Sequence, residues 1–321
     1  MQSNSKRLMS LLFLASFCFA PSIMAQLPEK SDSELARRIE ASPPLPFLET
    51  RLSLYSSFSD WELGAVAGVA IGRSEDIYVI QRGDKADPIL VFDKQGKLIR
   101  SWGRGDFALP HSLRLDSRGN VWAVDAQASK VIKYDSTGRK LLTIEVSPVP
   151  IDGSSFRGIT DVAFAPNGNL YITDGYANAR ILEYTARGKE LKEWGHPGKG
   201  TGEFELPHGI QIGPDGIVYV ADRENGRIEK FNLNGKFMGE IDGLGRCYAL
   251  KLVQGVLWTS VSPMGEAPGA PGWLLKLDPH TGEILGHARV LDQRQGHALD
   301  VSSSGKVLVT AGNGVLSFQR N

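Results

Sequence analysis

The stretch Leu109–Tyr134, LPHSLRLDSRGNVWAVDAQASKVIKY, decides the fold, because the chain repeats its plan. A second copy is Leu206–Phe231, LPHGIQIGPDGIVYVADRENGRIEKF, and a third is Thr160–Tyr184, TDVAFAPNGNLYITDGYANARILEY. Each copy predicts an alternating strand, a tight turn containing glycine, a second strand ending in Asp, a polar loop and a third strand. Weaker copies bring the number of units to six, at Val66–Phe92, Tyr248–Leu277 and His297–Phe318.

Six units spaced roughly 40 to 50 residues apart are typical of propeller blades, since one blade cannot bury both of its faces alone. We therefore expect an all-β fold, a six-bladed β-propeller over residues 60–321. Residues 26–59 form an N-terminal segment, in which Phe47–Phe58 could add a strand to the last blade and latch the ring. An open stack of repeats is the alternative, disfavoured because no polar capping unit is visible.

The composition excludes several classes of protein. The 321 residues contain 36 Lys+Arg and 36 Asp+Glu, so no net charge favours nucleic acid or a membrane surface. Residues 1–25 resemble a cleaved signal peptide: Lys6 and Arg7 precede the largely apolar Leu8–Ala20, and small residues follow before Gln26. We expect a secreted or periplasmic monomer with no membrane attachment after cleavage.

Three of the six histidines occupy one position of the repeat. When the repeats are aligned on Gly119, Gly168, Gly216 and Gly305, the residues eight positions earlier are His111, Thr160, His208 and His297. The matching positions in the first and fifth blades lie near Ala67 and Cys247–Tyr248. Histidine therefore falls in alternate blades, at the start of the strand nearest the axis.

Alternate blades of a six-fold ring should direct three imidazoles at one point on the axis. Three neutral histidines with an open fourth position make a ligand set for catalytic zinc. The competing interpretation is that Pro-His is a packing motif of the repeat, with each ring stacked on a neighbouring blade.

A second position of the repeat returns to the same mouth of the channel. Fifteen residues after the histidine position come Arg82 and Arg223, and in the third blade Gly175, followed by Tyr176. An arginine can hold a carboxylate with two parallel hydrogen bonds. A phenol beside a dication and guanidinium groups should have a lowered pKa and could act as a base.

These segments resemble a known family. The repeats are similar to NHL repeats, and the likeness is to the peptidyl-α-hydroxyglycine α-amidating lyase (peptidylamidoglycolate lyase) propeller, over roughly residues 60 to 320. Four segments carry it: LPHSL from Leu109, TDGYANARI from Thr173, LPHG from Leu206 and ADRENGRI from Ala221.

The resemblance implies a zinc lyase that cleaves the C–N bond of a C-terminal α-hydroxyglycine, giving a peptide amide and glyoxylate. It implies zinc ligands at His111, His208 and His297, a base at Tyr176, and active-site arginines at Arg82 and Arg223. It also implies a structural Ca²⁺ on the backbone carbonyls of Val69 and Leu113 and on an acid after the third histidine, where this chain has Ala298. The substrate would be a small peptide or a related α-hydroxy amide.

Two other functions fit the same fold. A non-catalytic NHL propeller would bind a peptide, protein or glycan at the channel mouth and hold no stoichiometric metal. A propeller hydrolase such as a lactonase would gather acidic and Asn ligands around calcium, which the few carboxylates at the axial positions disfavour.

Overall fold

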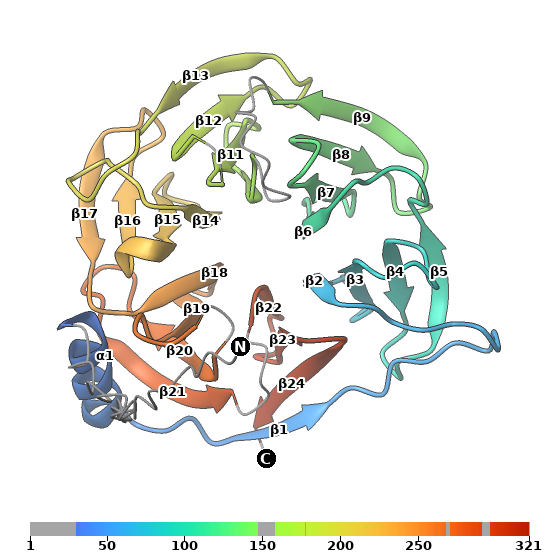
Figure 1. The fold of residues 1–321 in the computed structure, drawn as a ribbon, viewed down its shortest axis with the longest axis horizontal. Helices are drawn as coiled ribbons and strands as arrows, with labels where there is room; N and C mark the ends of the chain where they lie inside the picture. Colours follow the sequence, from blue (N-terminus) through green and yellow to red (C-terminus); the bar gives the residue numbers. More distant parts are fainter. Residues whose placement is uncertain (1–29, 147–157, 177, 268–269, 291–295, 321) are drawn as a thin grey trace, which may run out of the picture.

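A computed structural model describes residues 30–146, 158–176, 178–267, 270–290 and 296–320. Six four-stranded antiparallel sheets follow one another around a central channel, which confirms the six-bladed propeller (Figure 1). The predicted signal peptide lies outside the described residues. No helix in the described part of the chain is long and apolar enough to cross a membrane.

The blades follow the sequence repeats, with the innermost strand first. Blade 1 contains β2 (Val66–Ile71), β3 (Ile77–Gln81), β4 (Ile89–Phe92) and β5 (Leu98–Trp102). Blade 2 contains β6 (Pro110–Leu115), β7 (Val121–Asp125), β8 (Lys130–Tyr134) and β9 (Lys140–Glu145). Blade 3 contains β10 (Asp161–Phe164), β11 (Leu170–Asp174), β12 (Arg180–Tyr184) and β13 (Glu190–Trp194). Blade 4 contains β14 (Pro207–Ile212), β15 (Val218–Asp222), β16 (Arg227–Phe231) and β17 (Phe237–Ile241). Blade 5 contains β18 (Arg246–Val253), β19 (Val256–Ser262), β20 (Gly272–Leu277) and β21 (Ile284–Val290).

Blade 6 joins the two ends of the described chain. Its inner strands are β22 (Leu299–Val301), β23 (Val307–Ala311) and β24 (Gly314–Arg320), and its outermost strand is β1 (Phe47–Arg51), from the segment in which we expected a latch. β1 pairs antiparallel with β24, with Phe47 opposite Arg320 and Arg51 opposite Leu316. Backbone hydrogen bonds therefore hold the ring closed.

The hydrophobic core is divided among the contacts between blades. Six clusters of buried side chains each join residues of two adjacent blades, and one of them brings Ile80 of blade 1 against Leu113 and Ile132 of blade 2. Helix α1 (Lys30–Ala41) lies outside the ring, where its Leu35 enters the cluster between blades 4 and 5 (Figure 1). Each blade thus buries its faces only by contacting its neighbours.

The turn glycines used for the alignment have the backbone conformation that the turn requires. Gly119, Gly168, Gly216 and Gly305 have φ values of 81°, 86°, 79° and 87°. Residues other than glycine rarely adopt such positive φ values. The hairpin therefore has the same geometry in four blades, and the residue eight positions earlier reaches the same place beside the axis.

Candidate metal centre

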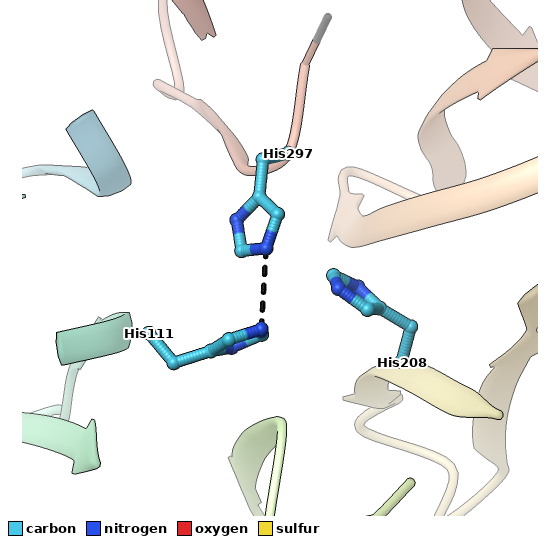
Figure 2. Close-up of side chains that lie close together, drawn as sticks. All are labelled: His111, His208 and His297. Atoms are coloured by element: carbon cyan, nitrogen blue, oxygen red, sulfur yellow. Dashed lines mark hydrogen bonds between the residues drawn. The ribbon is translucent and has the colours of Figure 1, made fainter. Parts of the chain in front are cut away.

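Histidines from three alternate blades meet on the channel axis. The candidate ligand atoms of His111, His208 and His297 all lie within 4.8 Å of one another. Figure 2 shows the three rings converging from three directions. His111 and His208 are buried, whereas His297 is partly buried.

A β-bulge directs the side chains of His111 and His208 inward. The register of β6 on β7 shifts between Pro110 and Ser112, and that of β14 on β15 shifts between Pro207 and Gly209, so His111 and His208 are each the extra residue of a bulge. His297 lies just before β22, outside the paired strand. The same shift occurs around Ala67 in blade 1 and Tyr248 in blade 5. A bulged residue is released from the strand ladder and its side chain is re-aimed.

Each ring is fixed by a carbonyl of the following blade. The Nδ1 atom lies 2.7 Å from the Thr160 oxygen in His111, 2.7 Å from the Tyr248 oxygen in His208 and 2.8 Å from the Ala67 oxygen in His297. A carbonyl can only accept, so each Nδ1 carries the proton and each Nε2 presents its lone pair to the axis. Such outer hydrogen bonds are typical of histidines that bind metals.

Sequence reasoning missed these carbonyls, although its own alignment contains the signal. Ala67, Thr160 and Tyr248 occupy the histidine position of the blades that lack histidine. Odd-numbered blades thus supply the acceptors, and even-numbered blades supply the rings.

The arrangement leaves lone pairs facing each other. The Nε2 atoms of His111 and His297 are 3.2 Å apart, marked by the dashed line in Figure 2. With a proton on both Nδ1 atoms, neither neutral ring can donate to the other. A shared cation would relieve this contact, and the chemistry of the three donors fits a metal ion.

Burial keeps the three rings neutral. Burial is the largest cause of the pKa of His111 and His208 lying well below the usual range, and the charges of neighbouring histidines and arginines lower it further. Burial, followed by the charge of Arg82, lowers the pKa of His297 to about 3. Neutral imidazoles are the form that binds a metal, so protons do not compete for this site at neutral pH.

Tyr176 lies directly beside the three rings. Its hydroxyl oxygen is 2.9 Å from Nε2 of His111 and 3.4 Å from Nε2 of His208. Gly175 precedes it because a Cβ there would come within 2.1 Å of the Pro207 carbonyl oxygen. The close approach of blades 3 and 4 therefore fixes the point from which Tyr176 reaches the axis.

The expected lowering of the Tyr176 pKa does not arise from the protein's own groups. Burial raises this pKa, whereas Arg223, through its charge and a hydrogen bond, and the charge of Arg82 lower it. The effect of burial on the Tyr176 pKa exceeds the combined effect of the two guanidinium groups. The expected lowering therefore depends on the positive charge of a bound metal ion.

Both predicted arginines border the site. Arg82 donates from Nε to the Pro110 carbonyl at 2.8 Å, beside His111, and Arg223 lies with its guanidinium carbon 5.6 Å from the centre of the Tyr248 ring. The charges of both act on Tyr176 and His208. The site therefore combines a metal-binding cluster, a phenol and two cations. The other histidines lie elsewhere: His196 and His280 are exposed, and His287 contacts Ser42.

The residues of the next channel layer do not fit the calcium ion that the resemblance implies. Val69 and Leu113 line a small cavity that the three histidines also line, but so does Arg114, whose guanidinium is paired with Asp161 through two hydrogen bonds. Ca²⁺ takes six to eight oxygen ligands. Here the available carboxylate is occupied by a resident cation, and Ala298 offers none.

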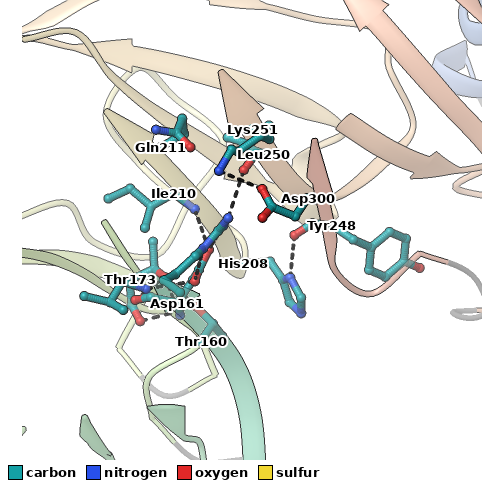
Figure 3. A network of polar contacts seen from close by, with 12 residues as sticks. Thr160, Asp161, Thr173, His208, Ile210, Gln211, Tyr248, Leu250, Lys251 and Asp300 are labelled. Atoms are coloured by element: carbon teal, nitrogen blue, oxygen red, sulfur yellow. Dashed lines mark hydrogen bonds and ion pairs between the residues drawn. The ribbon is translucent and has the colours of Figure 1, made fainter. Parts of the chain in front are cut away.

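Polar contacts in that layer connect all six blades. Figure 3 labels five of the residues that take part: Asp161, Ile210, Leu250, Lys251 and Asp300. Asp161 also accepts from the Ile210 amide at 3.2 Å, and Arg114 donates to the Leu250 carbonyl at 3.3 Å. Lys251 lies 2.6 Å from Asp300, which accepts from the Ile71 amide at 2.7 Å. Three of these charged residues lie three positions after the histidine position of their repeats: Arg114, Lys251 and Asp300. The same alignment that located the histidines could therefore have identified them.

Fold and site together define a class: a six-bladed β-propeller with a three-histidine centre on its axis. A family model for the NHL repeat matches residues 204–231. The chain is 32% identical over 260 residues to the peptidyl-glycine alpha-amidating monooxygenase of Mus musculus, covering 69% of this chain and 26% of that protein. It therefore spans about a quarter of the length of this relative.

A protein named "Probable peptidyl-alpha-hydroxyglycine alpha-amidating lyase" from Caenorhabditis elegans is 26% identical over 285 residues, or 78% of this chain and 80% of the relative. A solved streptogramin B lyase shares the fold, with a TM-score of 0.57 and 17% identity over 86% of this chain and 98% of that one. The chain is an NHL-repeat β-propeller that resembles the peptidyl-α-hydroxyglycine α-amidating lyases over most of its length. These relatives support a lyase-like function.

Proposed function

We propose that the chain is a secreted or periplasmic zinc-dependent lyase that cleaves the C–N bond of a C-terminal peptidyl-α-hydroxyglycine or a related α-hydroxy amide. One observation carries the proposal: three Nε2 lone pairs meet on the axis beside the hydroxyl of Tyr176. The export signal expected at residues 1–25 supports the location, and the amidating lyases among the relatives support the reaction.

His111, His208 and His297 would hold the zinc, which is a Lewis acid that can polarise a substrate oxygen. Arg82 and Arg223 bind and orient the substrate carboxylate, since a guanidinium can hold a carboxylate through two hydrogen bonds. Tyr176 accepts the proton of the substrate hydroxyl at its phenolic oxygen, for which it must be ionised, and a dication held by the three histidines would lower its pKa toward that form. The C–O bond then becomes the carbonyl of glyoxylate, the C–N bond breaks, and Tyr176 returns the proton to the departing amide nitrogen, which restores the phenolate.

The direct test uses the chain purified without residues 1–25. We expect about one zinc per chain, bound by the three histidines, and stoichiometric release of glyoxylate and amide from an N-acyl-α-hydroxyglycine. If the protein neither contains nor binds zinc, the lyase proposal fails, and a non-catalytic propeller that binds its ligand at the channel mouth takes its place.

Arg82→Ala should weaken substrate binding while leaving the metal in place. Loss of one charged hydrogen-bond donor to a carboxylate should raise KM by about tenfold or more. Steady-state kinetics together with metal analysis test this result. An unchanged KM would remove Arg82 from the anchoring role, and a loss of zinc would show that its bond to the Pro110 carbonyl supports His111 instead.

A further inference from the structure

Arg223 is held by a neighbouring carboxylate rather than by solvent. Its Nε and Nη2 atoms are each 2.8 Å from Oε1 of Glu224. The other carboxylate oxygen of Glu224 accepts from Nε of Arg246 at 2.9 Å. The side chains of Arg223, Glu224 and Arg246 are only 13%, 21% and 12% exposed, so they form a largely buried triad.

The triad has the charge that an anion site needs. Arg223 and Glu224 alone would form a neutral pair with little attraction for a carboxylate. Arg246 adds a second positive charge, so the unit carries one net positive charge. A guanidinium has five donors, and Glu224 uses two of those on Arg223, which leaves others for Tyr176 and for a ligand.

The triad also fixes one wall of the channel mouth. Arg246 donates from Nη1 to the Pro263 carbonyl at 3.0 Å and to the Glu266 carbonyl at 2.7 Å, both in the loop after β19. The same loop is held from outside the ring by Asp32 of α1, which accepts from the amides of Met264 and Gly265 at 2.5 and 2.6 Å. Blades 4 and 5, the loop and α1 therefore converge on the partner of Arg223.

We propose that Glu224 and Arg246 are positioning residues, which orient Arg223 toward the carboxylate of the substrate and tie that orientation to the loop after β19. This inference rests on the proposed lyase function. Neither residue needs to touch the substrate, because Glu224 acts through Arg223 and Arg246 acts through Glu224.

The experiment compares Glu224→Ala, Glu224→Gln and Arg246→Met in the zinc-loaded chain, with Glu183→Ala as the matched control. Glu183 is also a buried carboxylate in an ion pair, 3.2 Å from Lys192, but it lies on β12 of blade 3. Each protein is assayed with an N-acyl-α-hydroxyglycine and with its methyl ester, which lacks the negative charge. Zinc content shows that the centre is intact.

The sign of the Glu224→Ala effect is diagnostic. Electrostatics alone would tighten binding of a carboxylate when a nearby acid is removed, whereas loss of positioning weakens it. We expect KM for the acid to rise about tenfold in Glu224→Ala and Arg246→Met, with KM for the ester unchanged. Glu224→Gln keeps one oxygen acceptor for Arg223 and should recover part of the loss.

An unchanged or lower KM for the acid in Glu224→Ala would overturn the positioning role, as would an equal rise with the ester. If the wild-type chain releases no glyoxylate, the lyase proposal fails. The positioning role of Glu224 and Arg246 is then tested by calorimetric measurement of glyoxylate binding. Weaker binding by Glu224→Ala than by Glu183→Ala would still support positioning. Equal binding, or none by the wild type, would refute it.

Discussion

His208→Ala should abolish stoichiometric zinc binding and, with it, lyase activity, while the propeller remains folded. The substitution removes one of three converging Nε2 donors, and the loss of Lewis-acid stabilisation worth several kcal/mol lowers the rate by about a thousandfold or more. The fold should survive because the blades are held by hydrophobic clusters and by the pairing of β1 with β24. Metal analysis, glyoxylate release and thermal unfolding together measure these outcomes.

His280→Ala is the matched control, since His280 is exposed in the turn before β21. It should keep its zinc, its activity and its melting temperature. Full zinc content in His208→Ala would show that the axial cluster is not the metal site. Collapse of the fold in that variant would show that the three rings are a structural element rather than a catalytic one.

Arg114→Met should cause the largest loss of stability. The variant keeps much of the side-chain length but leaves the carboxylate of Asp161, 5% exposed, without its cation. Removing one partner of a buried ion pair typically costs about 3–5 kcal/mol of unfolding free energy. Chemical denaturation of the zinc-loaded protein measures the change.

The double variant Arg114→Met/Asp161→Asn should recover a large part of that loss, because no uncompensated charge remains and the amide oxygen can still accept from the Ile210 amide. Lys85→Met serves as the surface control. Its ion pair with Glu62 is 61% exposed on both sides, and its loss should change stability by less than about 1 kcal/mol. A stability of Arg114→Met equal to that of the control would contradict the structural role of the pair.

Calcium provides a separate check on this layer of the channel. Since Arg114 already supplies a cation to Asp161, millimolar Ca²⁺ should not raise the melting temperature of the wild-type protein, and chelation of calcium should not lower it. A stabilisation that saturates with calcium would show that the ion is held after all, on the carbonyls of Val69 and Leu113.

The sequence by itself determined the six blades, the meeting of three histidines and the placement of Tyr176 beside them. These features depend on local rules: strand alternation, turns closed by glycines such as Gly119, and a constant count of residues from turn to axis. Once each blade has the same geometry, ring symmetry brings His111, His208 and His297 to one point. No long-range contact has to be known in advance.

Only the tertiary structure decided which groups orient that site. The bulge that frees the Tyr248 carbonyl for His208, the pairing of Arg114 with Asp161, and the link from Arg246 to Glu224 all join different blades. The repeat alignment gives the level of the channel at which Tyr248 and Arg114 lie, but the partner that each one contacts depends on how neighbouring blades twist and pack when the ring closes. For the same reason the burial that raises the pKa of Tyr176 could not be read from its neighbours in the chain.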